Sequence, residues 1–172
     1  MNIFVVDACP IIAAQNLCDA HVCKMIVEAC QLLSTQDYLD GWTEGRYKAT
    51  HVNHPCRKCL ENRYNYSWLS MHLASLLNEY TYRFERVHKC QALNDSIWER
   101  VAVPENVRSY TDLLPFTALP KCMPYKFRTE GTDIHSVVES YRNYYRYKSH
   151  VLNRFKYTKR QEPEWLKEED EA

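Results

Sequence analysis

The chain has 172 residues and a mass of 20.5 kDa, which is enough for one domain with a proper hydrophobic core. Only three glycines leave little material for β-turns, so the composition favours an all-α fold and argues against a β-rich one. The apolar run at residues 3–6 is far too short for a signal-peptide core or a membrane span. We therefore expect a soluble cytoplasmic protein with no membrane partner.

The net charge of zero hides two charged segments near the C-terminus. Residues 121–160 contain ten Lys or Arg and three Asp or Glu, whereas residues 161–172 contain one Lys and six acidic residues. A basic segment followed by an acidic end is typical of a polyanion-binding face with a separate solvated tail. We expect one compact helical domain over residues 1–160 and a mobile acidic tail over 161–172.

The first long element is a central helix predicted over Cys9–Thr35, with Pro10 in its first turn. This stretch is apolar on nearly all sides. One narrow polar stripe interrupts it, formed by His21, Lys24, Glu28 and Gln31. A surface helix would show a broad polar face, so the stripe indicates a buried site or a cleft. The alternative is that Lys24 and Glu28 form an i, i+4 ion pair on a solvated strip.

A second helix is predicted to open at His54-Pro55, after a loop. The segment around it places four metal-ligand residue types within nine positions: His51, His54, Cys56 and Cys59. A structural zinc site is the alternative reading, but there is one C-x2-C pair and no second pair at a standard separation. We expect no metal, with the histidines and Asn53 serving a polar site. The eight cysteines are expected to be reduced thiols.

A third helix is predicted over residues 64–90, with Asn65 as its N-cap. Its polar strip includes Glu79 and Arg83 at i, i+4, which reads either as a surface pair or as part of a binding site. A short helix is expected over 94–100. Residues 103–131 carry four prolines among aromatics and are expected to form an ordered irregular arm around the core. Asp133 is expected to cap a last helix over residues 134–155.

The last helix interleaves cations with aromatic rings, a composition typical of a nucleic-acid contact surface. We predict that DNA or a nucleotide is contacted by Arg142, Tyr144, Tyr145, Arg146, Lys148, Arg154, Lys156, His51, Asn53 and Arg83. The alternative is that the tyrosines pack in the core while the cations are solvated. No P-loop, G-x-G-x-x-G, G-x-S-x-G or kinase motif is present.

Polar and apolar residues over roughly the first 90 positions resemble the bacterial and phage pyrimidine dimer DNA glycosylases of the endonuclease V type. The matching residues are Leu17, Asp19, His21, Val22, Lys24, Val27, Glu28, Ala29, Gln31 and Leu33, then Asn53, His54 and Pro55, then Glu79, Tyr80 and Arg83. The resemblance implies a compact helical enzyme of the host cytoplasm, if phage-encoded, that exposes a damaged pyrimidine. It also implies attack on the sugar C1′ by an N-terminal amine, support of base departure by a carboxylate, and elimination that nicks the strand.

These implications lead to a DNA N-glycosylase/AP lyase without a cofactor as the first hypothesis. Glu28 would be the carboxylate, His21 and His54 would handle protons or phosphate, and Lys24 would set the charge of Glu28 or act as an amine nucleophile. An ungapped alignment instead puts Cys23 or its neighbours at the carboxylate position. The second hypothesis is a non-catalytic nucleotide- or nucleic-acid-binding protein on the same scaffold, and the third is a structural phage protein.

Overall fold

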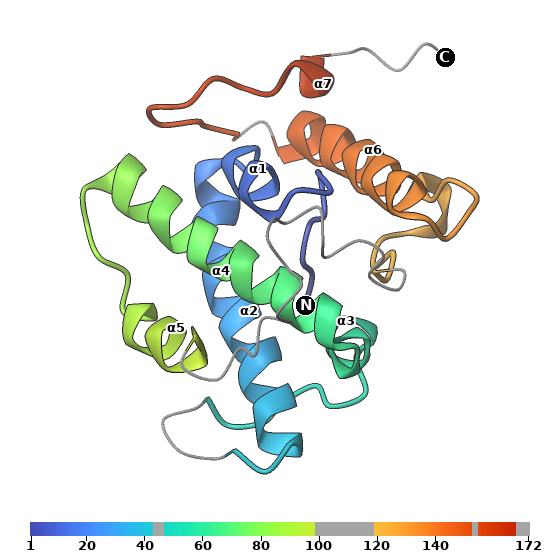
Figure 1. Cartoon of the computed structure of the whole chain (residues 1–172). Helices are drawn as coiled ribbons and strands as arrows, with labels where there is room; N and C mark the ends of the chain where they lie inside the picture. Colours follow the sequence, from blue (N-terminus) through green and yellow to red (C-terminus); the bar gives the residue numbers. More distant parts are fainter. Residues whose placement is uncertain (43–46, 99–118, 153–154, 168–172) are drawn as a thin grey trace.

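The computed structural model describes residues 1–42, 47–98, 119–152 and 155–167. Within these ranges the protein is mainly helical and contains no strand, as the low glycine content predicts. The elements, labelled in Figure 1, are α1 (Pro10–Gln15), α2 (Asp19–Leu39), α3 (Pro55–Lys58), the 3-10 turn η1 (Cys59–Glu61), α4 (Arg63–Phe84), α5 (Gln91–Trp98), the 3-10 turn η3 (Tyr125–Phe127), α6 (Ile134–Leu152) and α7 (Glu164–Lys167).

The predicted single helix over Cys9–Thr35 is two helices, α1 and α2, separated at residues 16–18. The break is stabilised by a side chain of α4, because the Arg83 guanidinium donates to the carbonyls of Gln15 and Leu17, each at 2.8 Å. The amide of Cys18 donates to the hydroxyl of Tyr145 at 2.9 Å. Tertiary hydrogen bonds thus satisfy the backbone groups that an unbroken helix would pair internally. The second helix, α2, then continues to Leu39, beyond the predicted end.

The core forms where α2 packs against α4, with α1 on α4. The N-terminal residues 1–9 pass between this pair and α6, as Figure 1 shows. Phe4 lies in that layer and contacts the rings of Tyr141, Tyr144 and Tyr145 of α6, with centroids 5.4–6.3 Å away. The N-terminal segment is therefore an interior element that fixes the position of residues 1 and 2.

The capping residues locate the remaining helices. Asn62, one turn earlier than predicted, caps α4 by accepting from the amides of Tyr64 and Asn65, and α4 ends at Phe84, short of the predicted residue 90. The predicted cap of the last helix is confirmed, because Asp133 accepts from the amides of His135 and Ser136. Of the predicted irregular arm, residues 119–131 are described and the rest lies outside the described residues.

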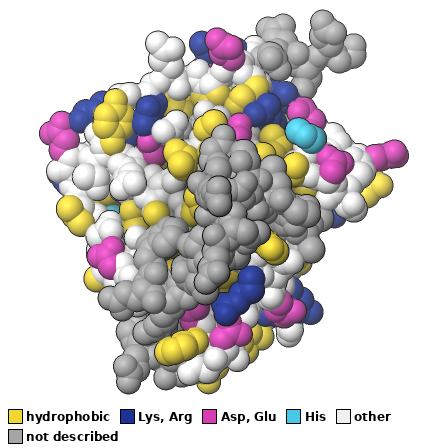
Figure 2. Space-filling view, in the orientation of Figure 1, with side chains coloured by type: hydrophobic (Ala, Val, Ile, Leu, Met, Phe, Trp, Pro, Cys, Tyr) yellow, Lys and Arg dark blue, Asp and Glu magenta, His cyan; other side chains and the backbone are white. Residues whose placement is uncertain are grey.

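The predicted tail begins in a packed segment. Leu166 of α7 is buried, and the Trp165 ring lies 5.9 Å from that of Tyr145, while residues 168–172 lie outside the described part. All eight cysteines are free in the structure. None of the described helices combines the length and apolar character needed to cross a membrane. On the face drawn in Figure 2, basic and acidic side chains are intermixed in the described part.

Candidate active site

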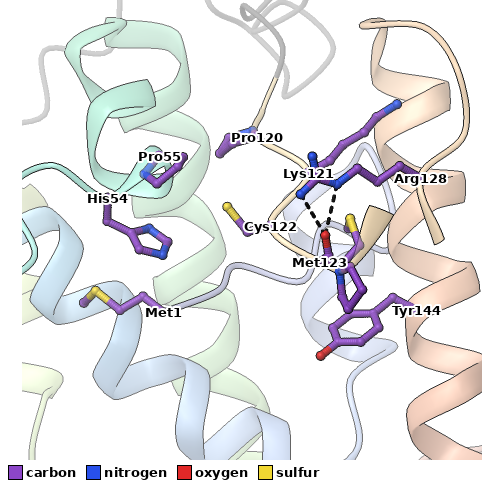
Figure 3. Close-up of a pocket in the computed structure, with 10 residues that line it drawn as sticks. Met1, His54, Pro55, Pro120, Lys121, Cys122, Met123, Arg128 and Tyr144 are labelled. Atoms are coloured by element: carbon purple, nitrogen blue, oxygen red, sulfur yellow. Dashed lines mark hydrogen bonds between the residues drawn. The ribbon is translucent and has the colours of Figure 1, made fainter. Parts of the chain in front are cut away.

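A pocket of about 570 Å³ lies between the start of α3 and the middle of α6. Figure 3 shows Met1 and His54 on one side, Tyr144 on the other, and the segment 120–128 between them. The lining residues are Met1, His54, Pro55, Pro120, Lys121, Cys122, Met123, Pro124, Arg128 and Tyr144. The pocket thus joins the N-terminus, α3, the Pro-rich segment and α6.

The backbone nitrogen of Asn2 donates to Oε2 of Glu28 at 2.6 Å. Glu28 comes from the predicted polar stripe of α2, and its side chain is 15% exposed. The Asn2 side chain is held in turn, because its Nδ2 donates to the Cys122 carbonyl at 3.0 Å and its Oδ1 accepts from the Ile3 amide at 2.8 Å. A carboxylate from α2 therefore lies against the nitrogen of residue 2, next to a pocket that Met1 lines.

Phe4 has a left-handed backbone (φ 54°), which is costly for an aromatic residue. The surrounding structure holds it there, since its ring stacks on His21 with centroids 4.7 Å apart. The bend at Phe4 returns the preceding residues toward α2. The strain is consistent with a site that depends on where residues 1 and 2 lie.

His54 has two roles in this region. Its Nδ1 accepts from the Cys56 amide at 3.1 Å and so caps α3, as the Pro55 position predicts. Its ring also projects into the pocket (Figure 3). Partial burial, then the positive α-amino group of Met1 and His51, lower the pKa of His54, with Glu28 opposing them. These effects favour the neutral form of the His54 ring.

We expected His21 and Lys24 to share a cavity with Glu28 and His54, and the structure does not bring these four together. His21 is buried away from the pocket lining, where its Nδ1 hydrogen-bonds the Tyr145 hydroxyl at 2.8 Å. Burial, followed by the charges of Lys148 and Lys24, lowers the pKa of His21 to about 4. Lys24 is 67% exposed and lies 3.5 Å from Glu28, so the i, i+4 pair of the alternative interpretation forms, but Glu28 is only 15% exposed and is not on a solvated strip.

Arg83 is fully buried, which contradicts both its predicted nucleic-acid contact and the surface-pair interpretation. Its guanidinium donates to Glu79 at 3.0 Å and to Asp19 at 3.1 Å, in addition to the two carbonyls at the α1–α2 break. Arg160 also binds Glu79. The sequence carries no signal for the burial of Arg83, because an i, i+4 pair of charges has the same spacing in a core as on a surface.

Two predicted nucleic-acid contacts on α6 also lie in the interior. Tyr145 is fully buried against Cys18 and His21, so its ring cannot stack on a base. Arg146 is buried and donates to the Trp165 carbonyl at 3.0 Å and to Asn143 at 2.7 Å. For these two residues the core-packing alternative is correct.

The other predicted contacts have more accessible positions. Tyr144 lines the pocket, and Lys148 lies beside it, with Nζ 5.2 Å from the ring centroid. Arg142 is half-buried and donates to the Val6 carbonyl at 2.9 Å. The loop residues His51 and Asn53 and the later Lys156 are exposed, whereas Arg154 lies outside the described residues.

The predicted histidine and cysteine cluster is only partly assembled. His54 and Cys56 meet Cys122 from the Pro-rich segment, and their ligand atoms all lie within 4.8 Å of one another. Cys59 is not part of this group, and its thiol donates to the Cys56 carbonyl at 3.2 Å. Sequence spacing could not reveal Cys122, which is separated from Cys56 by 66 positions. Asn2 was likewise missed as a positioned residue.

A comparison with protein families gives one match. The family model described as pyrimidine dimer DNA glycosylase matches residues 1–92, just over half of the chain. No curated protein and no solved structure matches the chain. The matched segment contains the Asn2–Glu28 contact, the α3 cap at His54 and the buried Arg83. The chain belongs to the pyrimidine dimer DNA glycosylase family.

Proposed function

We propose that the protein is a DNA N-glycosylase/AP lyase that acts on a damaged or modified pyrimidine in DNA. The observation that carries this proposal is the 2.6 Å hydrogen bond from the nitrogen of residue 2 to Glu28. The family mechanism joins an N-terminal amine to a carboxylate. Here the backbone nitrogen of residue 2, which would become that amine once Met1 is removed, lies against Glu28 beside the pocket. Membership of the family supports DNA as the substrate.

The nucleophile in this proposal is the α-amine that residue 2 carries once Met1 is removed. The amine nitrogen forms a bond to the sugar C1′ while the bond from C1′ to the base breaks, and the departing base takes up a proton. Glu28 is placed to accept a proton from the amine and to stabilise positive charge that develops at C1′. The C1′–O4′ bond of this adduct then breaks, so that the sugar ring opens, O4′ takes up a proton and C1′ forms an imine with the amine nitrogen. Loss of a proton from C2′ expels the 3′ phosphate by β-elimination, which nicks the strand.

The pocket suits an extruded base. Its volume of about 570 Å³ falls in the usual range of ligand pockets, roughly 300–1,000 Å³. Tyr144, Pro55 and Met123 supply aromatic and apolar surface to a flipped pyrimidine. Lys121 and Arg128 add positive charge at the rim, with their polar atoms anchored on the carbonyls of Thr129 and Met123.

Lys24 is the alternative nucleophile. A lysine needs a lowered pKa to attack at neutral pH, and burial is one way to lower it. The side chain of Lys24 is 67% exposed and therefore lacks that burial. We assign Lys24 to modulation of the charge of Glu28 and the nucleophile to the N-terminus.

The second candidate function is a non-catalytic protein that binds a nucleotide or damaged base. Asn2 favours it, because the bulk of asparagine disfavours removal of the preceding methionine. Met1 also lines the pocket, and while it is present the nitrogen of residue 2 is a peptide nitrogen and not an amine. This candidate predicts binding to damaged DNA without a covalent intermediate.

Borohydride trapping separates the two candidates. The protein is incubated with duplex DNA containing a pyrimidine dimer or an abasic site, reduced, and digested for peptide mass spectrometry. A glycosylase/lyase gives an adduct on a peptide that begins at Asn2, and Glu28→Gln abolishes it. The matched control is Glu61→Gln, which alters an exposed carboxylate and should trap normally. Tight binding with no adduct, from protein whose Met1 has been removed by an aminopeptidase, would establish the second candidate.

A further inference from the structure

We propose that His54, Cys56 and Cys122 form a zinc-binding site in the wall of the pocket. The three residues come from two segments far apart in sequence, the start of α3 and the Pro-rich segment. Figure 3 shows the His54 ring and the Cys122 thiol on adjacent sides of the pocket. The proposal does not depend on glycosylase activity.

The geometry is close to that of a tetrahedral metal site. The Sγ atoms of Cys56 and Cys122 lie 3.3 Å apart, and all three ligand atoms lie within 4.8 Å of one another. Bond lengths of about 2.3 Å for Zn–S and about 2.0 Å for Zn–N place tetrahedral ligand atoms roughly 3.5–3.8 Å apart. Small side-chain rotations are sufficient to reach these distances.

The donor set matches zinc among the common metals. Thiolates and imidazole select borderline and soft ions, and they exclude magnesium and calcium, which prefer oxygen ligands. Three protein ligands leave one coordination position, and Cys122 and His54 line the pocket, so this position faces the pocket. Water or a group bound in the pocket can occupy it.

The backbone around the ligands is held in place. The Cys122 carbonyl accepts from Asn2 Nδ2 at 3.0 Å, and the Cys122 amide donates to the Tyr141 hydroxyl at 3.4 Å. Cys56 is fully buried in α3. Positions fixed in this way lower the entropy lost when a metal orders its ligands.

The two thiols of the proposed site are hydrogen-bonded to each other. The Cys56 thiol donates to Cys122 Sγ, and this hydrogen bond is the main cause that lowers the pKa of Cys122. Arg128 and the α-amino group of Met1 act in the same direction, against burial. The same hydrogen bond and burial raise the pKa of Cys56, so zinc must displace its proton.

Coordination changes the role of His54. Without zinc, the Nδ1 lone pair accepts from the Cys56 amide. Zinc bound at Nδ1 would occupy this lone pair, and zinc bound at Nε2 would leave the proton on Nδ1, so the cap is lost in both cases. A zinc-bound imidazole can no longer transfer protons. Zinc coordination and the proposed proton-handling role of His54 are therefore mutually exclusive, and metal content distinguishes them.

The test is zinc binding to the full chain under reducing conditions. Metal-free protein is titrated with zinc against a chromogenic chelator, and cobalt(II) replaces zinc as a spectroscopic probe. We expect one equivalent per chain and a cobalt spectrum with tetrahedral thiolate bands. Cys122→Ser should reduce the intensity of the thiolate-to-cobalt band by about half. It should also lower the zinc affinity by more than the roughly 10–100-fold that loss of an outer-shell partner costs.

Matched variants guard against misfolding. His54→Asn retains an N-cap residue for α3 but removes the imidazole, so it should fold and bind zinc more weakly. Cys59→Ser is the control, because its thiol lies on the same segment and donates to the Cys56 carbonyl, outside the proposed ligand set. The proposal would be overturned if the parent protein bound no zinc, or if Cys122→Ser bound zinc as tightly as the parent protein. An equal loss of zinc binding in Cys59→Ser would also overturn it. Formation of a Cys56–Cys122 disulfide without zinc uptake by the reduced protein would also overturn it.

Discussion

Asn2 and Glu28 are 26 positions apart, yet the nitrogen of Asn2 lies 2.6 Å from the Glu28 carboxylate. The contact requires the strained bend at Phe4 and the anchoring of Asn2 on the Cys122 carbonyl. Three separate segments therefore cooperate to place one backbone nitrogen on one carboxylate. Such convergence is expected of a reaction centre in which the nucleophile and its base must be positioned within tenths of an ångström.

Glu28→Gln should abolish strand nicking while changing the free energy of unfolding by less than about 2 kcal/mol. The amide oxygen of Gln can still accept from the Asn2 nitrogen, but it cannot take up a proton or stabilise developing charge. Nicking assays and thermal unfolding of the same preparation check this prediction. Early unfolding of the variant, on the scale of about 3–5 kcal/mol for a broken buried pair, would mean that Glu28 is structural.

Lys24→Gln should leave borohydride trapping intact and change stability by only a few tenths of a kcal/mol, the usual worth of an exposed i, i+4 pair. The physical reason is its exposure, since 67% of the Lys24 side chain faces solvent. Peptide mapping of the trapped complex provides the measurement. An adduct that disappears in Lys24→Gln, while the Asn2 amine remains free, would identify Lys24 as the nucleophile.

Sequence patterns predicted the parts of this structure that depend on local spacing. The scarcity of glycine predicted the helical fold, the polar stripe on an apolar helix identified Glu28, and Pro55 located the start of α3. The break between α1 and α2 was missed because its carbonyls are satisfied by Arg83, 66 or more positions away. Tertiary contacts, which one sequence does not display, decide such positions.

Arg83→Ala should destabilise the protein by about 3–5 kcal/mol, because it leaves two carbonyls of the α1–α2 break without their buried partner and removes one of the two arginines that bind Glu79. DNA affinity of the folded fraction should not change. Denaturant unfolding provides the measurement. The matched control is the exposed Arg86, whose replacement by alanine should cost less than about 0.5 kcal/mol. Equal stability of the two variants would show that the Arg83 network contributes little.

Stability should fall as the pH is lowered from 6.5 toward 5. Burial lowers the pKa values of His21 and His72 to about 4, below their ordinary value of 6.5, so the unfolded chain binds more protons in this window. Their contribution is complete above pH 6.5 and is lost as the pH falls toward 4. Each histidine can add a slope of up to about 1.4 kcal/mol per pH unit. Unfolding of the parent protein and His72→Leu at several pH values measures this effect.

The variant His72→Leu should be less stable at pH 7.5, where the Pro10 carbonyl has lost its partner, and should show a flatter slope between pH 5 and 6.5. The comparison uses slopes, so the loss of stability at neutral pH does not affect it. Identical slopes in the two proteins would show that His72 does not titrate on unfolding in this range.

DNA binding should depend on salt through the accessible cations near the pocket and α6. Lys148 lies beside Tyr144 at the pocket, and Lys156 is exposed, so each is positioned to contact a phosphate. Each phosphate contact contributes about −0.9 to the slope of log affinity against log salt on duplex DNA. Replacing both lysines with Gln should therefore flatten that slope by about two units and weaken binding to all sequences alike, because phosphates carry no base information.

Arg146→Gln is the matched control for the lysine variants. The Arg146 guanidinium is buried on the Trp165 carbonyl, so the change should lower stability and leave the slope unchanged. Fluorescence anisotropy over a range of ionic strengths measures the slopes. A slope that responds to Arg146 and not to the two lysines would place the DNA on a different surface of the protein.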